Sequence, residues 1–460
     1  MEKSIYSPKE DKKQNQMKSV VDPNLPPALG KRIVVVGGGF AGIEFAKKIS
    51  TKYYQVVLLD KNNYHQFQPL FYQVATAGIE PSAISYPFRK LFQNRKNLHF
   101  RMTEVLNVDT TRKCLDTSIG EIKYDYLVLA MGATTNFYNN EQLERNSFRL
   151  KSTSDALTFR NSILRKFELA LLAPTKEKRK ELLQFVIVGG GPTGVEVCGA
   201  LSEMKKFILP KDYPEIDFDL MNIYLIESSD RVLAAMSPSS SLTAEKYLEN
   251  FGIQVIKNKT VKSYDGTTVT LSDETTLNTK TLVWAAGVKA VSIPGIDPNV
   301  VLPNNRIKVD EYNRVKGYND VFVLGDLAAN DKPLPQVAQV AIQQGKQLAK
   351  NLNKAGDVRK WKPFIYHDMG TMATVGRNKA VAEIYGLQIQ GFTAWFVWMF
   401  IHLISILGVK NRLQTFINWA WNYFSYDQSL RLMINTYKEH SIEPASTGKN
   451  TITEKITEMV

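Results

Sequence analysis

The chain has 460 residues, a length that suits about two to four domains. Of these residues 44% are hydrophobic and 22% are charged, a composition that excludes disordered, collagen-like and polytopic membrane proteins. The formal net charge of +13 suits a nucleic acid or an anionic membrane surface and does not choose between them. The two cysteines, Cys114 and Cys198, lie far apart in the sequence, which excludes a disulfide scaffold, a cysteine-based zinc site and a CxxC redox pair.

The two ends of the chain are polar. Residues 1–30 carry charges and prolines but no apolar segment of the kind found in signal peptides or membrane anchors, so they predict a disordered leader. Residues 441–460 are equally polar and predict a flexible tail. Neither end is expected to carry the chemistry.

A first nucleotide-binding unit begins with the apolar run RIVVVG, which indicates a strand buried on both faces of a parallel sheet. The run leads into GGGFAGIE, where Gly37, Gly39 and Gly42 occupy the GxGxxG positions. Gly37 permits the tight turn, Gly39 lets the backbone approach a pyrophosphate, and Gly42 lets the helix pack closely on the strand. The next apolar run, VVLLD, ends at Asp60, a possible acceptor for a ribose hydroxyl. This order of features favours a dinucleotide site over a purely structural turn.

The same unit recurs about 150 residues later, which is the most informative feature of the chain. Residues 185–196 read FVIVGGGPTGVE, with Gly189, Gly191 and Gly194 at the glycine positions, and the run IYLIE ends at Glu227. Two dinucleotide sites in one chain usually hold two different dinucleotides, one kept permanently and one exchanged. Such an arrangement moves a hydride from a nicotinamide to a flavin.

Further strands accompany the two units. Residues 124–135 and 281–290 each read as a strand that ends in a turn of small residues. The run VFVLGDLA ends in Gly325–Asp326, and a helix is predicted from AQVAIQQGKQLAKNL. Asp326 suits a flavin ribityl or phosphate ligand, while a helix cap is the alternative that its position alone favours.

The C-terminal part is apolar and aromatic. Residues 392–407 carry no formal charge with His402 neutral, but as a helix they span about 24 Å, short of a ~30 Å hydrocarbon core. Residues 413–424 have apolar side chains at helical spacing, and four of the six tryptophans lie between Trp395 and Trp421. The pattern predicts helices that lie in the headgroup region of a membrane, with a dimer interface or a plain core as the competing interpretation.

From residue 31 to about 440 the chain resembles the type II NADH dehydrogenases, within the flavoproteins that have two dinucleotide-binding domains. The resemblance rests on GGGFAGIE, NYHQFQPLFYQVATAGIEPS, GGGPTGVE, VLGD, AQVAIQQG and the C-terminal aromatic region. It implies an α/β fold with two Rossmann-like domains, as in glutathione reductase, followed by amphipathic helices that anchor the protein to a membrane. The implied units are a FAD-binding domain split between 31–150 and 291–370, an NADH-binding domain at 151–290 and a membrane-attachment region at 371–440.

The resemblance also implies the cofactor contacts. FAD would bind non-covalently at the first unit, with Asp60 or Lys61 near its ribose and Val105 beside its adenine; the full set of implied contacts is Gly37, Gly39, Phe40, Ala41, Gly42, Asp60, Lys61, Val105, Gly132, Gly325, Asp326, Ala338 and Gln339. NADH would bind at the second unit through Gly189, Gly191, Gly194, Glu227 and Gly287. Because the Glu227 carboxylate accepts from a 2′-hydroxyl and repels a 2′-phosphate, NADH is expected over NADPH, although Arg231 is placed to soften that preference.

The resemblance suggests a catalytic residue and quinone contacts. Glu196 would act in the redox cycle near the nicotinamide and flavin, and a favourable interaction with the helix dipole is its alternative. Gln339 and Gln343 share one helix face, and their amides would donate to the carbonyl oxygens of a quinone; without the resemblance, solvated side chains would be the better interpretation. Lys410 would lie near the quinone or would reach from the protein to the membrane surface. No metal site is expected.

Together these features predict a non-proton-pumping NADH:quinone oxidoreductase. A hydride would pass from NADH to FAD, and two electrons would then reduce a membrane quinone, either menaquinone or ubiquinone. The protein would be a monotopic homodimer on a membrane surface, on the cytoplasmic face of a bacterial inner membrane, without a nucleic-acid partner. The alternatives are a soluble NAD(P)H-dependent reductase of a protein acceptor and a flavin sensor related to apoptosis-inducing factor.

Overall fold

The computed structural model describes residues 23–28, 30–332, 334–354, 358–426 and 430–433. The predicted tail at 441–460 and most of the predicted leader lie outside the described residues. The described end of the leader lies against the first sheet, where the carbonyl of Pro26 accepts from Gln55 Nε2 at 2.9 Å and that of Pro23 accepts from Arg101 Nε at 2.6 Å.

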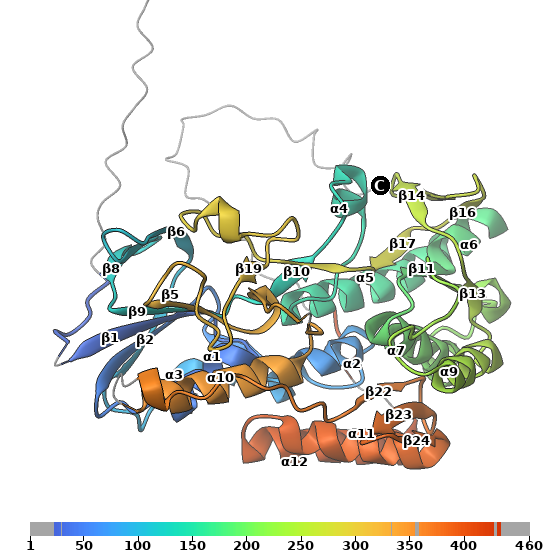
Figure 1. Cartoon of the computed structure of the whole chain (residues 1–460). Helices are drawn as coiled ribbons and strands as arrows, with labels where there is room; N and C mark the ends of the chain where they lie inside the picture. The colour runs from blue at the N-terminus through green and yellow to red at the C-terminus, as the bar shows by residue number, and fades with distance from the viewer. Residues whose placement is uncertain (1–22, 29, 333, 355–357, 427–429, 434–460) are drawn as a thin grey trace, which may run out of the picture.

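The first sheet is parallel, in the order β20-β9-β1-β2-β5. Its strands are β1 (Lys31–Val36), β2 (Tyr54–Asp60), β5 (Leu98–Met102), β9 (Tyr126–Leu129) and β20 (Val321–Val323). Both faces are covered, since alternate residues of β1 and β2 enter two different clusters of the hydrophobic core. The helices α1 (Phe40–Lys48) and α10 (Ala338–Leu352) pack against each other below the sheet in Figure 1. The late strand β20 thus returns to the sheet that opened the chain.

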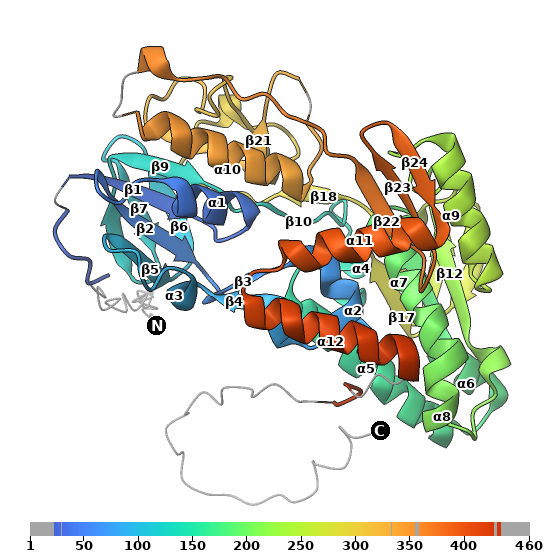
Figure 2. The same ribbon diagram turned by 90° about the horizontal axis from the view of Figure 1, so that it is seen from below.

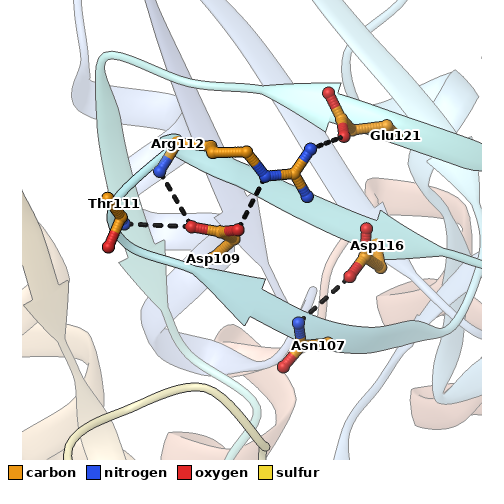
Figure 3. Close-up of polar contacts among 6 residues, drawn as sticks. All are labelled: Asn107, Asp109, Thr111, Arg112, Asp116 and Glu121. Atoms are coloured by element: carbon orange, nitrogen blue, oxygen red, sulfur yellow. Dashed lines mark hydrogen bonds and ion pairs between the residues drawn. The ribbon is translucent and has the colours of Figure 1, made fainter.

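A small antiparallel sheet covers the other face. It consists of β6 (Val105–Asp109), β7 (Cys114–Thr117) and β8 (Gly120–Lys123). Figure 3 shows the side chains that fix its hairpins: Asp109 accepts from the backbone of Arg112 at 2.8 Å and from its guanidinium at 2.7 Å, and the same guanidinium reaches Glu121 at 2.8 Å. On the neighbouring rung, Asn107 donates to Asp116 at 3.0 Å.

The second parallel sheet has the order β13-β12-β11-β17. Its strands are β11 (Gln184–Val188), β12 (Asn222–Ile226), β13 (Gln254–Ile256) and β17 (Thr281–Trp284), with the helices α5 (Thr153–Leu172), α6 (Lys176–Leu183), α7 (Pro192–Glu203) and α9 (Pro238–Asn250). A further antiparallel sheet comprises β14 (Val261–Tyr264), β15 (Thr268–Leu271) and β16 (Thr276–Asn278). Two antiparallel strands, β10 (Ala133–Thr135) and β18 (Val288–Ala290), pair where the chain crosses between the regions of the first and the second parallel sheet.

The C-terminal region combines a sheet with two helices. The sheet is β22 (Thr371–Thr374), β23 (Ala380–Ile384) and β24 (Leu387–Gln390), and the helices are α11 (Gly391–Ser405) and α12 (Val409–Ser425). The strand β22 packs on α7, and α11 packs on β23. Figures 1 and 2 show α11 and α12 side by side across the lower face of the molecule. Within the described residues, no helix combines the length and the apolar character needed to cross a membrane.

Candidate functional site

The two glycine turns have matching backbone geometry. Gly37 has a φ of +102° and Gly189 one of +106°, a region that favours glycine. A Cβ atom added at Gly37 would lie 2.4 Å from the carbonyl oxygen of Ala130, and one added at Gly189 would lie 2.8 Å from that of Ala285. The turn in each unit therefore requires glycine for its conformation and for its close approach to the neighbouring strand.

The second and third glycines of each turn differ in their surroundings. A Cβ at Gly42 or Gly194 would lie 1.9 Å from the carbonyl oxygen of the first glycine, so these positions let the helix begin close to the strand. At Gly191 an added Cβ would meet nothing within 4 Å, and at Gly39 its nearest neighbour would lie 3.9 Å away. The middle glycines therefore border open space at the starts of α1 and α7.

The helix starts at these sites have no side-chain caps. Six described helices before the C-terminal region have eight or more residues. Three of them, α5, α6 and α9, begin at a Ser or Thr whose side-chain oxygen accepts from a backbone N–H of the first turn. In contrast, α1, α7 and α10 begin at Gly39, Gly191 and Val337 without such a hydrogen bond. Their first N–H groups and positive dipole ends are thus available to anionic or carbonyl groups of a ligand.

Each unit holds an acid beside its glycine turn. Asp60 accepts from the N–H of Gly38 at 2.7 Å, and burial raises the pKa of its carboxyl. Glu227 accepts from Gly190 at 2.5 Å and from the backbone of Ser229 at 2.7 Å. Burial alone would raise the pKa of Glu227, but the hydrogen bonds from Ser229 and Gly190 outweigh it and lower that pKa. Glu227 is therefore ionised at neutral pH, as an acceptor for a ribose hydroxyl must be.

Asp326 lies between the first unit and the start of α10. It follows Gly325, which has a φ of +69° and donates its N–H to Gln344 Oε1 at 2.6 Å. The residue before α10 is Val337, so Asp326 does not cap this helix and the alternative drawn from the sequence is wrong. Burial raises the pKa of Asp326, while the positive charges of Lys151 and Arg306 lower it.

The other predicted cofactor contacts occupy varied places. Phe40 and Ala41 open α1, Lys61 is exposed after β2, Val105 begins β6, and Ala338 begins α10. Gly132 and Gly287 are both turn residues with φ values of +70° and +86°. A Cβ at Gly132 would meet nothing within 4 Å, whereas one at Gly287 would collide with the hydroxyl of Tyr138.

Glu196 is buried in the first half of α7, with 8% of its surface exposed. Burial raises the pKa of its carboxyl well above the usual value, although the N–H of Thr374 donates to the carboxyl and lowers it in part. Burial therefore favours the protonated form of this carboxyl over the ionised form. This buried acid lies where α7 meets β22 of the C-terminal sheet.

The predicted quinone contacts are not equivalent. Gln339 and Gln343 both lie on α10, but the Gln343 amide is paired with the main chain of His367: it donates to the carbonyl at 2.8 Å and accepts from the N–H at 3.0 Å. Gln343 thus holds the segment that leads to β22. Lys410 is exposed in the first turn of α12, the helix at the bottom of Figure 1.

Sequence reasoning missed a buried polar group around Tyr72, on α2 (Phe71–Ala75). The Tyr72 hydroxyl lies 3.1 Å from Thr374 Oγ1 and accepts from Gln73 Nε2 at 3.1 Å, and Gln73 in turn accepts from Trp419 Nε1 at 2.7 Å. Tyr72 and Gln73 belong to the motif NYHQFQPLFYQVATAGIEPS. That motif carried the signal, but its spacing gave no reason to single out these two residues.

Both C-terminal helices carry exposed apolar side chains. On α11 they recur every four residues, at Phe392, Phe396, Phe400 and Ile404, and on α12 they are Val409, Leu413, Phe416, Ile417, Trp421 and Phe424. This exposure argues against a plain core for the α12 stripe. Two of the four clustered tryptophans differ from the headgroup location expected for them: Trp398 and Trp419 are 1% and 8% exposed and face inward.

The comparisons with known proteins agree with this geometry. Residues 31–345 match the pyridine nucleotide-disulphide oxidoreductase family, and residues 368–425 match the NDH2 C-terminal domain. The chain is 32% identical over 423 residues to the type II NADH:quinone oxidoreductase Ndh of Mycobacterium tuberculosis, covering 88% of this chain and 90% of that protein. It is 29% identical to the type II NADH:quinone oxidoreductase of Staphylococcus saprophyticus, over 80% of this chain and 93% of that protein.

Solved structures show the same fold. The structure of NDH2 from Plasmodium falciparum in complex with NADH superposes with a TM-score of 0.81 at 20% identity and covers 88% of this chain and 100% of that chain. The sulfide:quinone oxidoreductase of Aquifex aeolicus gives a TM-score of 0.64 at 19% identity, covering 86% of this chain and 96% of that chain.

Proposed function

The chain belongs to the type II NADH:quinone oxidoreductases, within the pyridine nucleotide-disulphide oxidoreductase family, and from this we propose which of its residues carry each step. The enzyme uses FAD and NADH, reduces a quinone and is membrane-associated. Bound FAD accepts a hydride and releases two electrons to the acceptor. The reactive cysteine pair that a dithiol reductase needs is missing, because Cys114 and Cys198 are both buried and lie on β7 and α7.

The first unit holds FAD in this proposal. The open space beyond Gly39 and the uncapped start of α1 would receive the pyrophosphate, and Asp60 the ribose. The uncapped start of α10, at Ala338 and Gln339, would face the flavin ring, with Asp326 beside the ribityl chain. The FAD-binding domain comprises 31–150 and 291–370, consistent with the return of β20 to the first sheet.

The second unit holds NADH in residues 151–290. Gly191 repeats the open space of Gly39, and Glu227, ionised and fixed by four hydrogen-bond donors, would accept from the adenosine ribose. A carboxylate at this place repels a 2′-phosphate, so the proposal favours NADH over NADPH.

The matched glycine turns are the observation that carries this assignment, and one pair of variants tests it. Gly39→Val fills the space in the first unit and is expected to yield folded protein without bound flavin. Gly191→Val is expected to retain the yellow flavin, to resist reduction by NADH and to accept electrons from dithionite. The opposite pattern, with flavin lost only in Gly191→Val, would show that the second unit holds FAD and contradict the assignment.

Glu196 acts as the proton donor near the nicotinamide and flavin in this proposal. Its support is a buried carboxyl, with a pKa that burial raises, in the helix that follows the second glycine turn.

Gln339 is the stronger candidate for contact with the quinone. It begins α10 beside Ala338, while the Gln343 amide is occupied by His367 and would act by holding the 362–370 segment in place. Lys410, exposed at the apolar face, would contact lipid headgroups or a quinone that enters from the membrane.

Attachment to the membrane would be monotopic, through the apolar face of α11 and α12. The exposed side chains of this face would enter the acyl boundary, and this geometry gives a quinone direct access to the protein. The proposal further includes a homodimer, menaquinone or ubiquinone as acceptor, and the cytoplasmic face of a bacterial inner membrane.

A further inference from the structure

Gly38, which lies between the first two glycines of the GxGxxG pattern, has both of its backbone polar groups paired. Its N–H donates to Asp60 Oδ2 at 2.7 Å, and its carbonyl oxygen lies 3.1 Å from Nδ1 of His65. A carbonyl oxygen can only accept, so Nδ1 of His65 carries the hydrogen and donates it. His65 is thus tied to the turn that the proposed function assigns to FAD, although it is not among the FAD contacts expected from the sequence.

The His65 ring has a single N–H, and Gly38 receives it. The side chain is 4% exposed, and burial lowers the pKa of His65 to about 4, so the ring is neutral near neutral pH. A neutral imidazole carries one hydrogen on its two nitrogens, and the contact with Gly38 places it on Nδ1. The Phe40 ring meets the His65 ring edge to face, with their centroids 5.2 Å apart, and packs it in place.

The side chain of Phe88 covers Gly38. A Cβ atom added at Gly38 would lie 2.1 Å from Cζ of Phe88, so the ring is in direct contact with the backbone of the turn. Phe88 is fully buried, and its ring packs against that of Phe100 on β5 with 5.1 Å between centroids. Gly38 is therefore confined by a hydrogen-bond donor at its carbonyl and by an aromatic ring at its Cα.

His65 and Phe88 come from one antiparallel pair of short strands, β3 (Tyr64–Gln66) and β4 (Ser85–Pro87). His65 is the central residue of β3. Phe88 directly follows β4, and its N–H donates to the carbonyl of Asn63 at 3.0 Å. The β3–β4 pair therefore brings both side chains to the same glycine turn.

The β3–β4 pair is itself anchored outside the first sheet. Gln66 Oε1 accepts from the N–H of Thr153, at the start of α5, at 2.6 Å. Asn411 Nδ2 donates to the carbonyl of Ser85 at 3.1 Å, where Figure 2 shows β4 beside the start of α12. Each strand of the pair is thus fixed to a long helix, so the pair can hold the turn in a constant position.

The contact with His65 sets the direction of the next N–H group. The carbonyl of Gly38 and the N–H of Gly39 belong to one planar trans peptide, so they point in opposite directions. The Gly39 N–H donates to no described residue, and it lies at the start of α1, beside the open space proposed for the pyrophosphate. By holding the carbonyl of Gly38, His65 therefore fixes the direction of an unpaired donor at the FAD site.

The second unit holds the corresponding residue in a different way. The carbonyl of Gly190 accepts from the backbone N–H of Leu233 at 2.7 Å, and the three heavy atoms closest to an added Cβ at Gly190 all belong to Glu227. The turn is thus held by a loop backbone and is not covered by an aromatic ring. This difference matches the two ligands, because the enzyme keeps its FAD and exchanges NADH for NAD⁺ in every turnover.

We propose that the β3–β4 pair retains FAD by clamping the glycine turn of the first unit, with His65 as the residue that positions the Gly39 N–H. When the donor at Nδ1 is removed, the peptide between Gly38 and Gly39 can rotate, and the charge-assisted hydrogen bond from Gly39 to the pyrophosphate weakens. The inference rests on the proposed assignment of FAD to the first unit, and it adds to that assignment a residue that controls how long the cofactor stays bound.

The test measures release of FAD from the full-length holoenzyme in detergent, read from the rise in flavin fluorescence after dilution into flavin-free buffer. His65→Phe keeps a ring and removes the donor, and it is expected to release FAD about tenfold faster than the wild type. His65→Asn loses the ring but can place an amide N–H where Nδ1 stood, so its release rate should stay within about threefold of the wild type. A role in packing alone would give the reverse order, with slower release from His65→Phe than from His65→Asn.

Further variants separate the clamp from general destabilisation. His99→Phe is the matched control, since His99 lies on β5 of the same sheet and its Nε2 has no hydrogen-bond partner; it should release FAD at the wild-type rate. Phe88→Leu removes the ring over Gly38 and keeps the donor, and it is expected to speed release as well. The KM for NADH should be unchanged in FAD-loaded His65→Phe, because the second turn does not depend on His65.

The outcomes distinguish this inference from the proposed function. Release at the wild-type rate from His65→Phe, or faster release from His65→Asn than from His65→Phe, would overturn the role of His65. His65→Leu, which also lacks a donor, replaces His65→Phe if that variant does not fold. Wild-type release from Phe88→Leu would remove Phe88 from the clamp. A folded wild-type protein without flavin would instead overturn the assignment of FAD to the first unit, and this inference with it.

Discussion

The backbone N–H of Gly190 donates to Glu227 Oε2 over 2.5 Å and ties the glycine turn of the second unit to the acid at the end of its second strand. The first unit repeats this relationship, where Gly38 donates to Asp60 over 2.7 Å. The carboxylate oxygen that the glycine N–H reaches, Oδ2 of Asp60 or Oε2 of Glu227, accepts from no other hydrogen-bond donor of the described residues, so it retains a lone pair for a ribose hydroxyl. The two nucleotide units therefore share their geometry down to single hydrogen bonds.

Coenzyme preference is expected to depend on Glu227. Glu227→Ala removes the charge that repels a 2′-phosphate and should lower the preference for NADH over NADPH by about tenfold, equivalent to roughly 1.4 kcal/mol. The ratio of kcat/KM for the two coenzymes measures this effect. Glu274→Ala, an exposed acid of the same domain, should leave the ratio unchanged. Equal catalytic efficiency with both coenzymes in the wild type would refute the assignment of Glu227.

Replacement of Glu196 by glutamine should change the stability of the protein in a pH-dependent way. Burial raises the folded pKa of Glu196, so the folded state keeps a proton that the unfolded state loses once pH exceeds the ordinary carboxyl pKa. The wild type therefore loses stability as pH rises toward the folded pKa, whereas Glu196→Gln does not. The Tm of Glu196→Gln relative to wild type should increase from pH 5 toward pH 8, and a constant difference would show that the folded carboxyl is ionised throughout.

The same variant should slow turnover. Glu196→Gln keeps the shape of the side chain and removes its acidic proton, so quinone reduction is expected to fall by about 10²-fold, typical of the loss of a general acid. Stopped-flow absorbance separates reduction of the flavin by NADH from its reoxidation by quinone. Full retention of both rates would refute a role for Glu196 in the cycle.

Gln339 and Gln343 should respond differently to replacement by alanine. Gln343→Ala loses two hydrogen bonds to His367 and is expected to lower the free energy of unfolding by about 1–3 kcal/mol. Gln339→Ala should leave unfolding nearly unchanged and raise the KM for a short-chain quinone. Thermal unfolding and steady-state kinetics on both variants test this division, and a raised quinone KM only in Gln343→Ala would reverse it.

Membrane attachment should depend on the exposed apolar face of α12. Leu413 and Trp421 are 57% and 61% exposed, and each is expected to contribute about 1.5–3 kcal/mol when buried in the acyl boundary. Leu413→Ser with Trp421→Ser should weaken binding to anionic liposomes by more than tenfold in flotation assays. Leu106→Ser serves as the control, because Leu106 is an exposed leucine of β6, a strand that lies far from α12 in Figure 1. Equal flotation of all variants would contradict attachment through this face.

The nucleotide units could be predicted from the sequence because their signals are local. A buried apolar strand, three glycines, a helix and an acid follow one another within residues 32–60 in the first unit and within 185–227 in the second. The structure places β1 and β11 within one residue of the predicted starts. The signals for the C-terminal helices are equally local. The uncharged apolar run at 392–407 predicts α11 (Gly391–Ser405), and the helical spacing of apolar residues at 413–424 predicts α12 (Val409–Ser425).

The polar network could not be predicted, because it depends on contacts between distant segments. Tyr72, Glu196, Thr374 and Trp419 come from four separate elements, and the sheet that presents Thr374 was not foreseen at all. Its strands are short, and they follow a stretch in which apolar and polar residues do not clearly alternate. Spacing also failed to separate Gln339 from Gln343, since both lie on one helix and only the partner of Gln343, on a distant loop, distinguishes them.

The most direct test is the anaerobic absorbance of the purified protein in detergent during addition of NADH and then of a short-chain quinone. The account predicts a flavin spectrum that NADH bleaches and that the quinone restores rapidly. Bleaching without recovery would contradict quinone as the acceptor, and a folded protein without bound flavin would contradict the assignment of the first nucleotide unit.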